Sequence, residues 1–206
     1  MELFPTFLRL NGRPVLVVGG GPVAASKLAA LAAAGAAITV VAPDVCAAVR
    51  DAGVSVVRRE FIESDLDGAW FVVAAATPDV NTRVARAAEA RHLFVNAVDD
   101  PPNASAYLGG VVRRAGVTLA ISTDGHAPAL AGLLREGFDA LLPADLDRWM
   151  DTARSIRRAW KANGTPMHDR RPQLLDALVA LYTPAPAAAP RVWERSEALR
   201  ERSEGR

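Results

Sequence analysis

The feature that most constrains the fold is a short apolar run that ends in three glycines and precedes a stretch of helix-forming residues. Residues 14–18 (PVLVV) are typical of a parallel strand buried on both faces. Residues 23–34 are mostly alanine and leucine, which favour a helix, and Gly35 is typical of a helix end. A buried strand, a glycine turn and a helix in this order predict the start of a Rossmann-type βαβ unit.

The rest of the first half repeats this alternation. A helix is predicted at residues 78–92, and further strands at 37–41, 54–57, 69–75 and 93–98. Strands that alternate with helices at this spacing predict an α/β fold, with a parallel sheet covered on both faces. Half of the 206 residues are hydrophobic, which is enough for a packed core.

The pattern changes after residue 99, where two prolines mark a loop. Two strands are predicted at 105–113 and 117–123, outside the alternation, and exposed strands of this kind often pair with a second subunit. Further helices are predicted at 128–142, 145–162 and 173–182. Residues beyond 183 are of low complexity and then highly charged, which is typical of a disordered tail.

The glycine turn has the spacing Gly19-x-Gly21-x-x-Ala24 of a dinucleotide-binding site. Gly19 is expected to permit the tight turn, Gly21 the close approach of a pyrophosphate, and Ala24 tight packing of helix on strand. The helix start at Pro22 and Val23 would present N–H groups and the positive end of the helix dipole to the phosphates. The alternative is a tight turn without a ligand, but the strand–turn–helix context favours binding.

An acidic residue at the end of the second strand usually binds the ribose hydroxyls of NAD. Here Asp44 follows Pro43 and lies a residue or two later than expected, so it either binds the ribose or caps the next helix. No arginine follows until Arg50, so nothing obvious would bind a 2′-phosphate. NAD is therefore favoured over NADP as the cofactor.

Composition argues against several other classes of protein. The net charge of +1 gives no general attraction to nucleic acid or membranes. Cys46 is the only cysteine, so no disulfide forms within the chain, and the three histidines are far apart for metal ligands. No apolar run reaches the roughly 18 residues of a membrane span, and no signal-peptide core is found. We expect a cytoplasmic protein without nucleic-acid or membrane partners.

Several motifs share one register from the N-terminus to about residue 180. They are Leu3-Phe4-Pro5 with Phe7-Leu8, Val17-Val18-Gly19-Gly20-Gly21 with Val23-Ala24 and Lys27, Ala75-Ala76-Thr77 with Asn81, Asn96-Ala97-Val98-Asp99, and residues 122–135. With these motifs the chain resembles the precorrin-2 dehydrogenase/sirohydrochlorin ferrochelatase family, the N-terminal module of siroheme synthase. Asn-x-Val-Asp after the fifth strand is the most specific of them.

The resemblance implies NAD-dependent oxidation of precorrin-2, a tetrapyrrole, to sirohydrochlorin in siroheme biosynthesis. Many members of the family also insert ferrous iron, as a substrate, to give siroheme. Members are homodimers, which implies a Rossmann domain at residues 1–112, a dimerisation region at 113–144, a helical domain at 145–183 and a tail at 184–206. The resemblance also implies that Thr77 contributes to the cofactor site, and that Asn96, Thr123 and His126 contribute to the tetrapyrrole site.

Asp99 is the candidate catalytic residue. It follows a parallel strand at its carboxyl end, where ligands bind in open α/β sheets. Oxidation removes a hydride, which NAD accepts, and a proton, which a carboxylate can take. Iron insertion displaces two pyrrole protons, so Asp99 could act there too and contact the metal, with Asp100 beside it. An aspartate before two prolines is by itself more typical of a turn, and it is the resemblance that favours catalysis.

The loop at residues 122–128 departs from the family pattern. Asp124 stands where the family usually has glycine, and Ala127 where it has serine, which leaves open whether this chain inserts iron. His126 is either a proton carrier or weak metal contact, or an ordinary loop residue near a helix start. The substrate's carboxylates would suit arginine side chains, and three are candidates by position: Arg113, Arg114 and Arg135.

Two other functions are compatible with a Rossmann unit. An NAD-sensing regulatory module without catalysis usually has an acidic residue directly at the end of the second strand, whereas Asp44 lies later. Such a module also leaves the motif from Asn96 to Asp99 unexplained. An oxidoreductase for another small substrate would need a substrate domain, for which the remaining hundred or so residues barely suffice.

Overall fold

The computed structural model describes residues 3–183, so the predicted tail at 184–206 lies outside the described residues. The chain divides into two units, Met1–Val112 with Thr118–Leu141, and Arg113–Val117 with Leu142–Arg206. The predicted domain boundaries stay a prediction.

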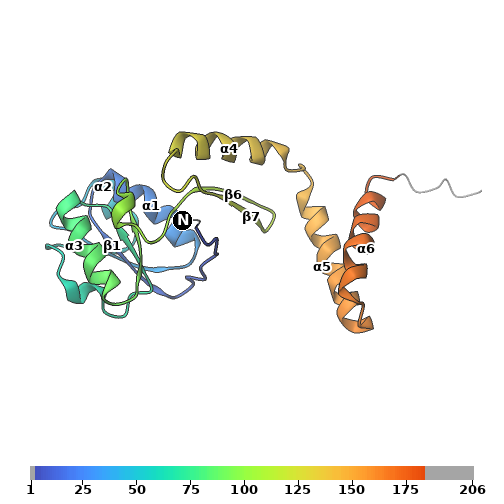
Figure 1. Cartoon of the computed structure of the whole chain (residues 1–206), viewed down its shortest axis with the longest axis horizontal. Helices are drawn as coiled ribbons and strands as arrows, with labels where there is room; N and C mark the ends of the chain where they lie inside the picture. The colour runs from blue at the N-terminus through green and yellow to red at the C-terminus, as the bar shows by residue number, and fades with distance from the viewer. Residues whose placement is uncertain (1–2, 184–206) are drawn as a thin grey trace, which may run out of the picture. The chain divides into compact units, whose positions relative to one another are not determined.

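The first unit is built on a five-stranded parallel sheet, which confirms the predicted α/β class (Figure 1). Its strands are β1 (Pro14–Val18), β2 (Ala37–Val41), β3 (Ser55–Val57), β4 (Phe71–Ala74) and β5 (Phe94–Ala97). The order is β3-β2-β1-β4-β5. The chain thus adds β2 and β3 on one side of β1 and then β4 and β5 on the other side of β1. The reversal between β1 and β4 is a topological switch point, where ligands bind at the carboxyl ends of the strands.

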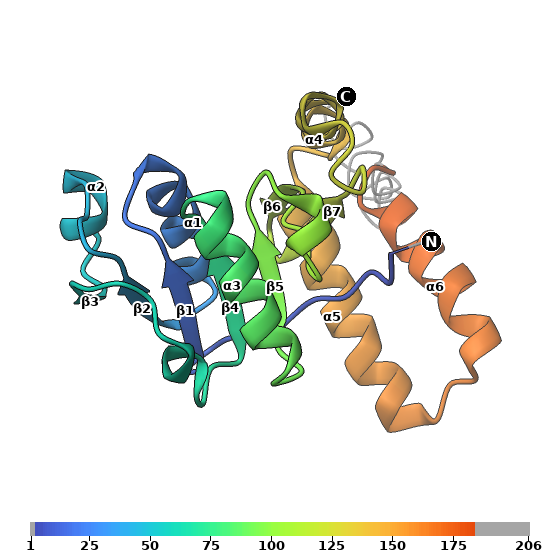
Figure 2. The ribbon, with the colours of Figure 1, turned by 60° about the vertical axis from the view of Figure 1, so that its left-hand side comes forward.

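Two helices cover the two faces of the sheet (Figure 2). On one face, α1 (Pro22–Ala33) packs Leu28 and Leu31 against a core that includes Val17 and Val73. On the other, α3 (Pro78–Glu89) packs Val84 against a core that includes Val72. Successive strand residues therefore alternate between two apolar layers, as expected for strands buried on both faces.

Short turns connect these elements, and the sequence did not predict them. They are the four-residue helix α2 (Ala47–Arg50) and two 3-10 helices, η1 (Glu63–Leu66) and η2 (Pro101–Asn103). They add little to the sheet, but η2 directly follows Asp99 and Asp100. It therefore fixes the chain's path at the end of β5.

The predicted strand at 105–113 is wrong over its first five residues. The N–H groups of Ser105 and Ala106 both donate to the carbonyl of Val95, each over 2.9 Å, and Ser105 Oγ accepts from the N–H of Val95. Both residues thus bind a single residue of β5, so they form no strand ladder. The strand β6 begins only at Gly110–Arg114 and pairs with β7 (Val117–Ile121).

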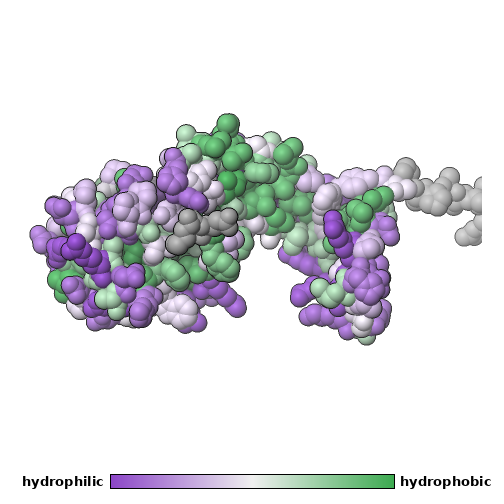
Figure 3. Space-filling model, in the orientation of Figure 1, coloured by the Kyte–Doolittle hydropathy of each residue, from purple (hydrophilic) through white to green (hydrophobic). Residues whose placement is uncertain are grey.

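Helix α4 (Pro128–Leu141) carries large apolar side chains that remain exposed in the described part of the chain. Ala131 is its buried residue. Five large apolar side chains are exposed and recur at helical spacing: Leu130, Leu133, Leu134, Phe138 and Leu141. They contribute to the hydrophobic surface over α4 in Figure 3. Exposed apolar surfaces of this kind are often found at interaction sites.

The second unit contains α5 (Leu146–Asn163) and α6 (Met167–Ala180), joined through the left-handed Gly164. The predicted helix at 173–182 is wrong at its start, because α6 begins six residues earlier and continues through Pro172. A proline removes one helical hydrogen bond, and here it does not end the helix. Trp160 Nε1 donates to Gln173 Oε1 over 2.6 Å and joins the two helices. Within residues 3–183, no helix combines the length and apolar character that crossing a membrane requires.

Candidate functional site

The glycine turn lies at the carboxyl end of β1, at the switch point. Gly19 has a φ of 121°, and a Cβ there would lie 2.2 Å from the carbonyl oxygen of Ala75. A Cβ on Gly20 would lie 2.0 Å from the carbonyl oxygen of Asp44. Both glycines are therefore required by the fold itself, because the turn is packed between the chain after β2 and the chain after β4. The predicted role of Gly19 in the tight turn is confirmed, whereas that of Gly20 was missed.

Gly21 differs from its two neighbours. Its φ of −84° suits any residue, and a Cβ there would meet no heavy atom within 4 Å. It precedes a helix whose first turn carries neither an acidic residue nor a side-chain cap. Pro22 has no N–H, and the next N–H groups begin at Val23. Open space beside uncapped helix N–H groups fits the pyrophosphate of NAD, so the residues present suit this cofactor.

Asp44 and Pro43 are exposed beyond the end of β2. The N-cap of α2 is Cys46, with no side-chain cap hydrogen bond, so Asp44 does not cap this helix. The capping alternative is thus wrong. The binding of ribose by Asp44 stays a prediction.

The turn between β4 and α3 is held by a buried side chain. Asn81 is 4% exposed; its Oδ1 accepts from the N–H of Ala76 over 3.0 Å, and its own N–H donates to the carbonyl of Thr77. Thr77 is the exposed N-cap of α3 and is fixed by this pair of bonds. Asn81 was noted in the sequence as part of a motif, but this positioning role was not predicted. An asparagine four residues after a helix-capping threonine was the available signal.

A pocket of about 290 Å³ lies at the carboxyl end of β5. Its lining comes from α1, the end of β5, the chain before β6, the loop after β7, and α4, all within the first unit. Its polar lining includes Lys27, Asn96, Asp99, Asp100, Thr123 and Arg135. Three of the predicted site residues therefore meet here, namely Asn96, Asp99 and Thr123. His126 is exposed and is not among the lining residues, and its role stays a prediction.

Asp99 and Asp100 have different surroundings. Asp100 Oδ2 accepts from Asn103 Nδ2 over 2.8 Å. Within the described part of the chain, no hydrogen bond or ion pair is found for the Asp99 carboxylate. Asp99 also has a φ of 54°, a left-handed conformation that costs a non-glycine residue roughly 1 kcal/mol and is best tolerated by asparagine and aspartate. An exposed, strained carboxylate without a partner is available to take a proton.

Asn96 contributes a buried hydrogen-bond acceptor without a donor. Its side chain is 7% exposed, and Nδ2 donates to the carbonyl of Ala106 over 3.0 Å. Oδ1 is the only buried side-chain polar atom within residues 3–183 that lacks a hydrogen bond. Such a group typically costs about 1–3 kcal/mol of stability, so it points to a donor supplied by a ligand.

Two cations line the pocket. Lys27, on α1, is half-buried, and Arg135, on α4, pairs with Glu136 over 3.0 Å. Of the three arginine candidates, Arg135 is the one in the pocket. Arg113 is exposed, and Arg114 donates to the carbonyl of Leu142 within the second unit. Positive charge beside a cleft suits a ligand that carries carboxylates.

The loop before α4 contains the residues that depart from the family pattern. Asp124 has a φ of 54°, which is the conformation that glycine adopts most easily, and its N–H donates to Ser122 Oγ over 3.1 Å. Thr123 Oγ1 accepts from the N–H of Ala127 over 3.2 Å. Asp124 thus occupies a position that would suit glycine, and Thr123 lines the pocket from the same loop.

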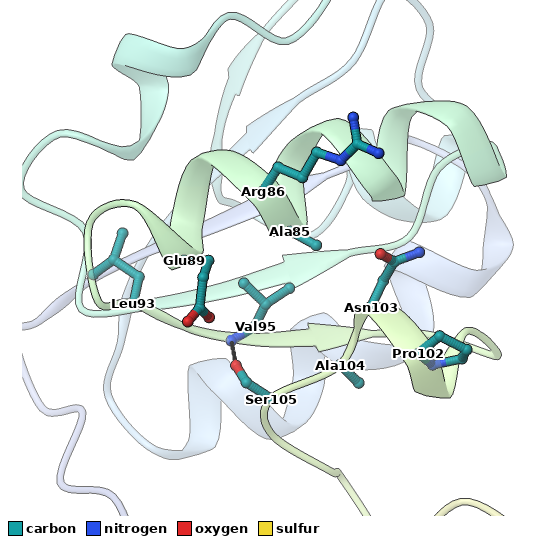
Figure 4. A pocket seen from close by; sticks show the side chains of 9 residues that line it. All are labelled: Ala85, Arg86, Glu89, Leu93, Val95, Pro102, Asn103, Ala104 and Ser105. Carbon is teal, nitrogen blue, oxygen red and sulfur yellow. Dashed lines mark hydrogen bonds between the residues drawn. The ribbon is translucent and has the colours of Figure 1, made fainter.

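A second pocket, of about 350 Å³, lies between α3 and the chain that leads away from η2 (Figure 4). The side chains of Arg86 and Glu89 point in different directions there, and Ser105 Oγ is bound to the N–H of Val95. These groups do not converge on a ligand position, so we assign the candidate site to the pocket that contains Asp99.

Several known proteins are similar to this chain. A family model described as "Putative NAD(P)-binding" matches residues 6–110, just over half of the chain. Siroheme synthase 2 of Cronobacter sakazakii and the siroheme synthase of Escherichia coli O157:H7 are 42% and 39% identical to it over 176 residues. Each match covers 83% of this chain and 38% of the relative, so the chain spans less than half the length of these relatives.

A solved structure is also similar over most of the chain. It is described as "SirC, precorrin-2 dehydrogenase" and matches with a TM-score of 0.66 and 27% sequence identity. The match covers 84% of this chain and 88% of that one. The similarity therefore extends beyond the glycine turn to nearly all of the described residues.

Proposed function

Because this chain belongs to the family described as "Putative NAD(P)-binding", we propose that it oxidises precorrin-2 to sirohydrochlorin with NAD, a step in siroheme biosynthesis. The observation that carries the proposal is the position of Asp99, an unpaired carboxylate in a pocket at the carboxyl end of β5. The similarity to the precorrin-2 dehydrogenase over most of both chains supports it. A regulatory module that only binds NAD would not need this pocket.

The cofactor site is proposed on the turns at the ends of β1, β2 and β4. When bound there, NAD would supply the hydride acceptor. The glycine turn and the start of α1 would hold the pyrophosphate, through Gly19, Gly21, Pro22 and Val23. The free N–H groups and the positive end of the dipole of α1 would point at it. Pro43 and Asp44 would contact the adenine-side ribose, and Thr77 the part of the cofactor that reaches across β4. The absence of an arginine between Asp44 and Arg50 favours NAD over NADP.

The pocket beside Asp99 is proposed to hold the tetrapyrrole. Asp99 would accept the proton that oxidation releases, since its carboxylate has no partner among the described residues. Lys27 and Arg135 would bind carboxylates of the substrate, and Thr123 would donate its hydroxyl. His126 lies outside the lining, so we give it no role in this mechanism.

An anaerobic assay tests the proposal. Purified protein is mixed with precorrin-2 and NAD, and NADH formation is followed by absorbance together with the spectrum of sirohydrochlorin. We expect both to appear in equal amounts and only when NAD is present. A folded protein that binds NAD but forms no NADH would contradict the enzyme and favour the regulatory module.

Insertion of ferrous iron is a second proposed activity. It is supported by Asp99 and Asp100, which both line the pocket and could each take a pyrrole proton. Ferrous or cobaltous ion is added to sirohydrochlorin with and without protein, and the absorbance change is followed. A rate no faster than the protein-free rate would restrict the chain to dehydrogenation.

We further propose that the chain forms a homodimer through the apolar face of α4 and the β6–β7 pair (Figure 3). Leu133, on this face, is 65% exposed. Leu133→Glu should therefore convert a dimer into a monomer in sedimentation velocity, because a charge cannot be buried without a partner. Met167→Glu replaces an apolar residue on α6 that is 75% exposed and should leave the dimer intact. A monomeric wild-type protein at micromolar concentration would contradict this proposal.

A further inference from the structure

We propose that Asn96 Oδ1 accepts a hydrogen bond from an N–H group of the ligand bound in the pocket. The inference rests on the proposed function, because both ligands of that reaction carry such a group. NAD has the carboxamide N–H of its nicotinamide, and the tetrapyrrole has N–H groups on its pyrrole rings. Asn96 would then help to determine which ligand the site accepts and how it is oriented.

The orientation of the Asn96 amide is fixed by its other end. Nδ2 donates to the carbonyl of Ala106 over 3.0 Å, and a carbonyl oxygen can only accept. Rotating the amide by 180° would bring two acceptors together, so the observed orientation is the stable one. Oδ1 is therefore presented as an acceptor.

Burial makes the missing donor significant. Asn96 is 7% exposed, so bulk water does not readily replace a donor. Asn81, the other buried asparagine, shows the usual situation, since its Oδ1 accepts from the N–H of Ala76. Buried acceptors are normally satisfied in this way, and the exception is expected at a functional site.

Position connects this acceptor with the reaction. Val95 and Ala97 of β5 belong to the core under α3, so Asn96, between them, lies on the opposite face of the sheet. On that face it lines the same pocket as Lys27 and Asp99. A neutral amide adds an acceptor there without placing a second buried charge beside Asp99.

The experiment compares Asn96→Leu with the wild-type protein and with Ser105→Ala. Leucine has a similar volume but no acceptor. Ser105→Ala is a matched control because it also removes one bond between β5 and the following segment, the one from the N–H of Val95, but leaves Oδ1 in place. Thermal unfolding checks that each variant is folded.

The first arm measures the binding of NAD by calorimetry without tetrapyrrole. It is repeated with 3-acetylpyridine adenine dinucleotide, in which a methyl group replaces the carboxamide nitrogen. If Oδ1 binds the carboxamide, wild type should prefer NAD over the analogue by about tenfold or more, and Asn96→Leu should lose that preference. The wild-type comparison needs no variant, so it remains informative if Asn96→Leu does not fold.

The second arm measures the binding of sirohydrochlorin by absorbance titration. If Oδ1 binds a pyrrole N–H, Asn96→Leu should raise the Kd of sirohydrochlorin by about tenfold or more and leave the Kd of NAD unchanged. If Asn96→Leu changed the Kd by less than about twofold in both arms, the inference would be overturned. It would also be overturned if Ser105→Ala weakened binding as much as Asn96→Leu. Neither arm depends on turnover, so a wild type that binds normally but forms no NADH would contradict the proposed function and not the role of Asn96.

Discussion

Asp99→Asn should lower the rate of precorrin-2 oxidation by about 10²- to 10⁴-fold while NAD still binds with nearly normal affinity. Asparagine is the appropriate replacement because Asp99 has a φ of 54°, and asparagine adopts this left-handed conformation at least as easily as aspartate. The backbone is therefore kept and only the proton acceptor is lost. Alanine would add backbone strain at the same position and confuse the two effects. Single-turnover formation of NADH, with the Kd of NAD measured in parallel, checks this prediction.

Asp100→Asn provides the comparison. The Asp100 carboxylate accepts from Asn103 Nδ2, so its loss should disturb the η2 turn and reduce turnover less than the loss of Asp99. Wild-type turnover in Asp99→Asn would show that another group takes the proton. If Asp100→Asn lowered the turnover rate more than Asp99→Asn, Asp100 and not Asp99 would be the catalytic residue.

Gly21→Ala should weaken NAD binding by about 10- to 100-fold without lowering the melting temperature of the protein. A Cβ at this position meets no atom of the chain within 4 Å, and the φ of −84° suits alanine, so the fold should not change. The methyl group would instead occupy the space in which the pyrophosphate approaches the backbone. Calorimetric titration with NAD, together with thermal unfolding, measures both effects.

Gly20→Ala is the matched variant one residue earlier, and the opposite result is expected. Its Cβ would lie 2.0 Å from the carbonyl oxygen of Asp44 and 2.9 Å from the Cα of Val45, so the backbone itself must move. We expect a loss of about 2–4 kcal/mol in unfolding free energy. If Gly21→Ala destabilised the protein as much as Gly20→Ala, the open space beside Gly21 would not be a ligand site.

The sheet could be predicted because its signals are local. Each strand is a short apolar run bounded by glycine, proline or a charged turn, and the five predicted strands are all present, most of them shorter by one to three residues. The turn after β1 could be predicted for the same reason, since Gly19 and Gly21 lie two residues apart. The resemblance drawn from the motifs is confirmed by relatives that match over 83% of the chain.

Other parts depend on contacts between distant segments and could not be predicted. Nothing in the local sequence shows that Ser105 and Ala106 both bind Val95, which is why residues 105–109 were wrongly expected to form a strand. Gly20 is required by a carbonyl group 24 residues further along the chain. Lys27 and Arg135 line one pocket although more than a hundred residues separate them.

The candidate site shows the same division. Asp99 was predicted from its place after a strand, but its left-handed backbone and its lack of a partner were not. Asn96 was predicted only through the resemblance, and its orphaned Oδ1 depends on the carbonyl of Ala106, whose position the sequence does not specify. The expected contribution of His126 has no support from the pocket lining.

The bonds between Val95 and the segment at Ser105 also affect how copies of the chain can associate. They occupy the outward-facing N–H and C=O of Val95, in the middle of β5. At the other edge of the sheet, β3 is only three residues long. The β5 edge therefore offers no continuous row of free N–H and C=O groups to a strand from another molecule, and the β3 edge offers only a short one. Growth of the sheet into a continuous, edge-to-edge aggregate is thus disfavoured at β5 by these bonds and at β3 by the small number of peptide groups available.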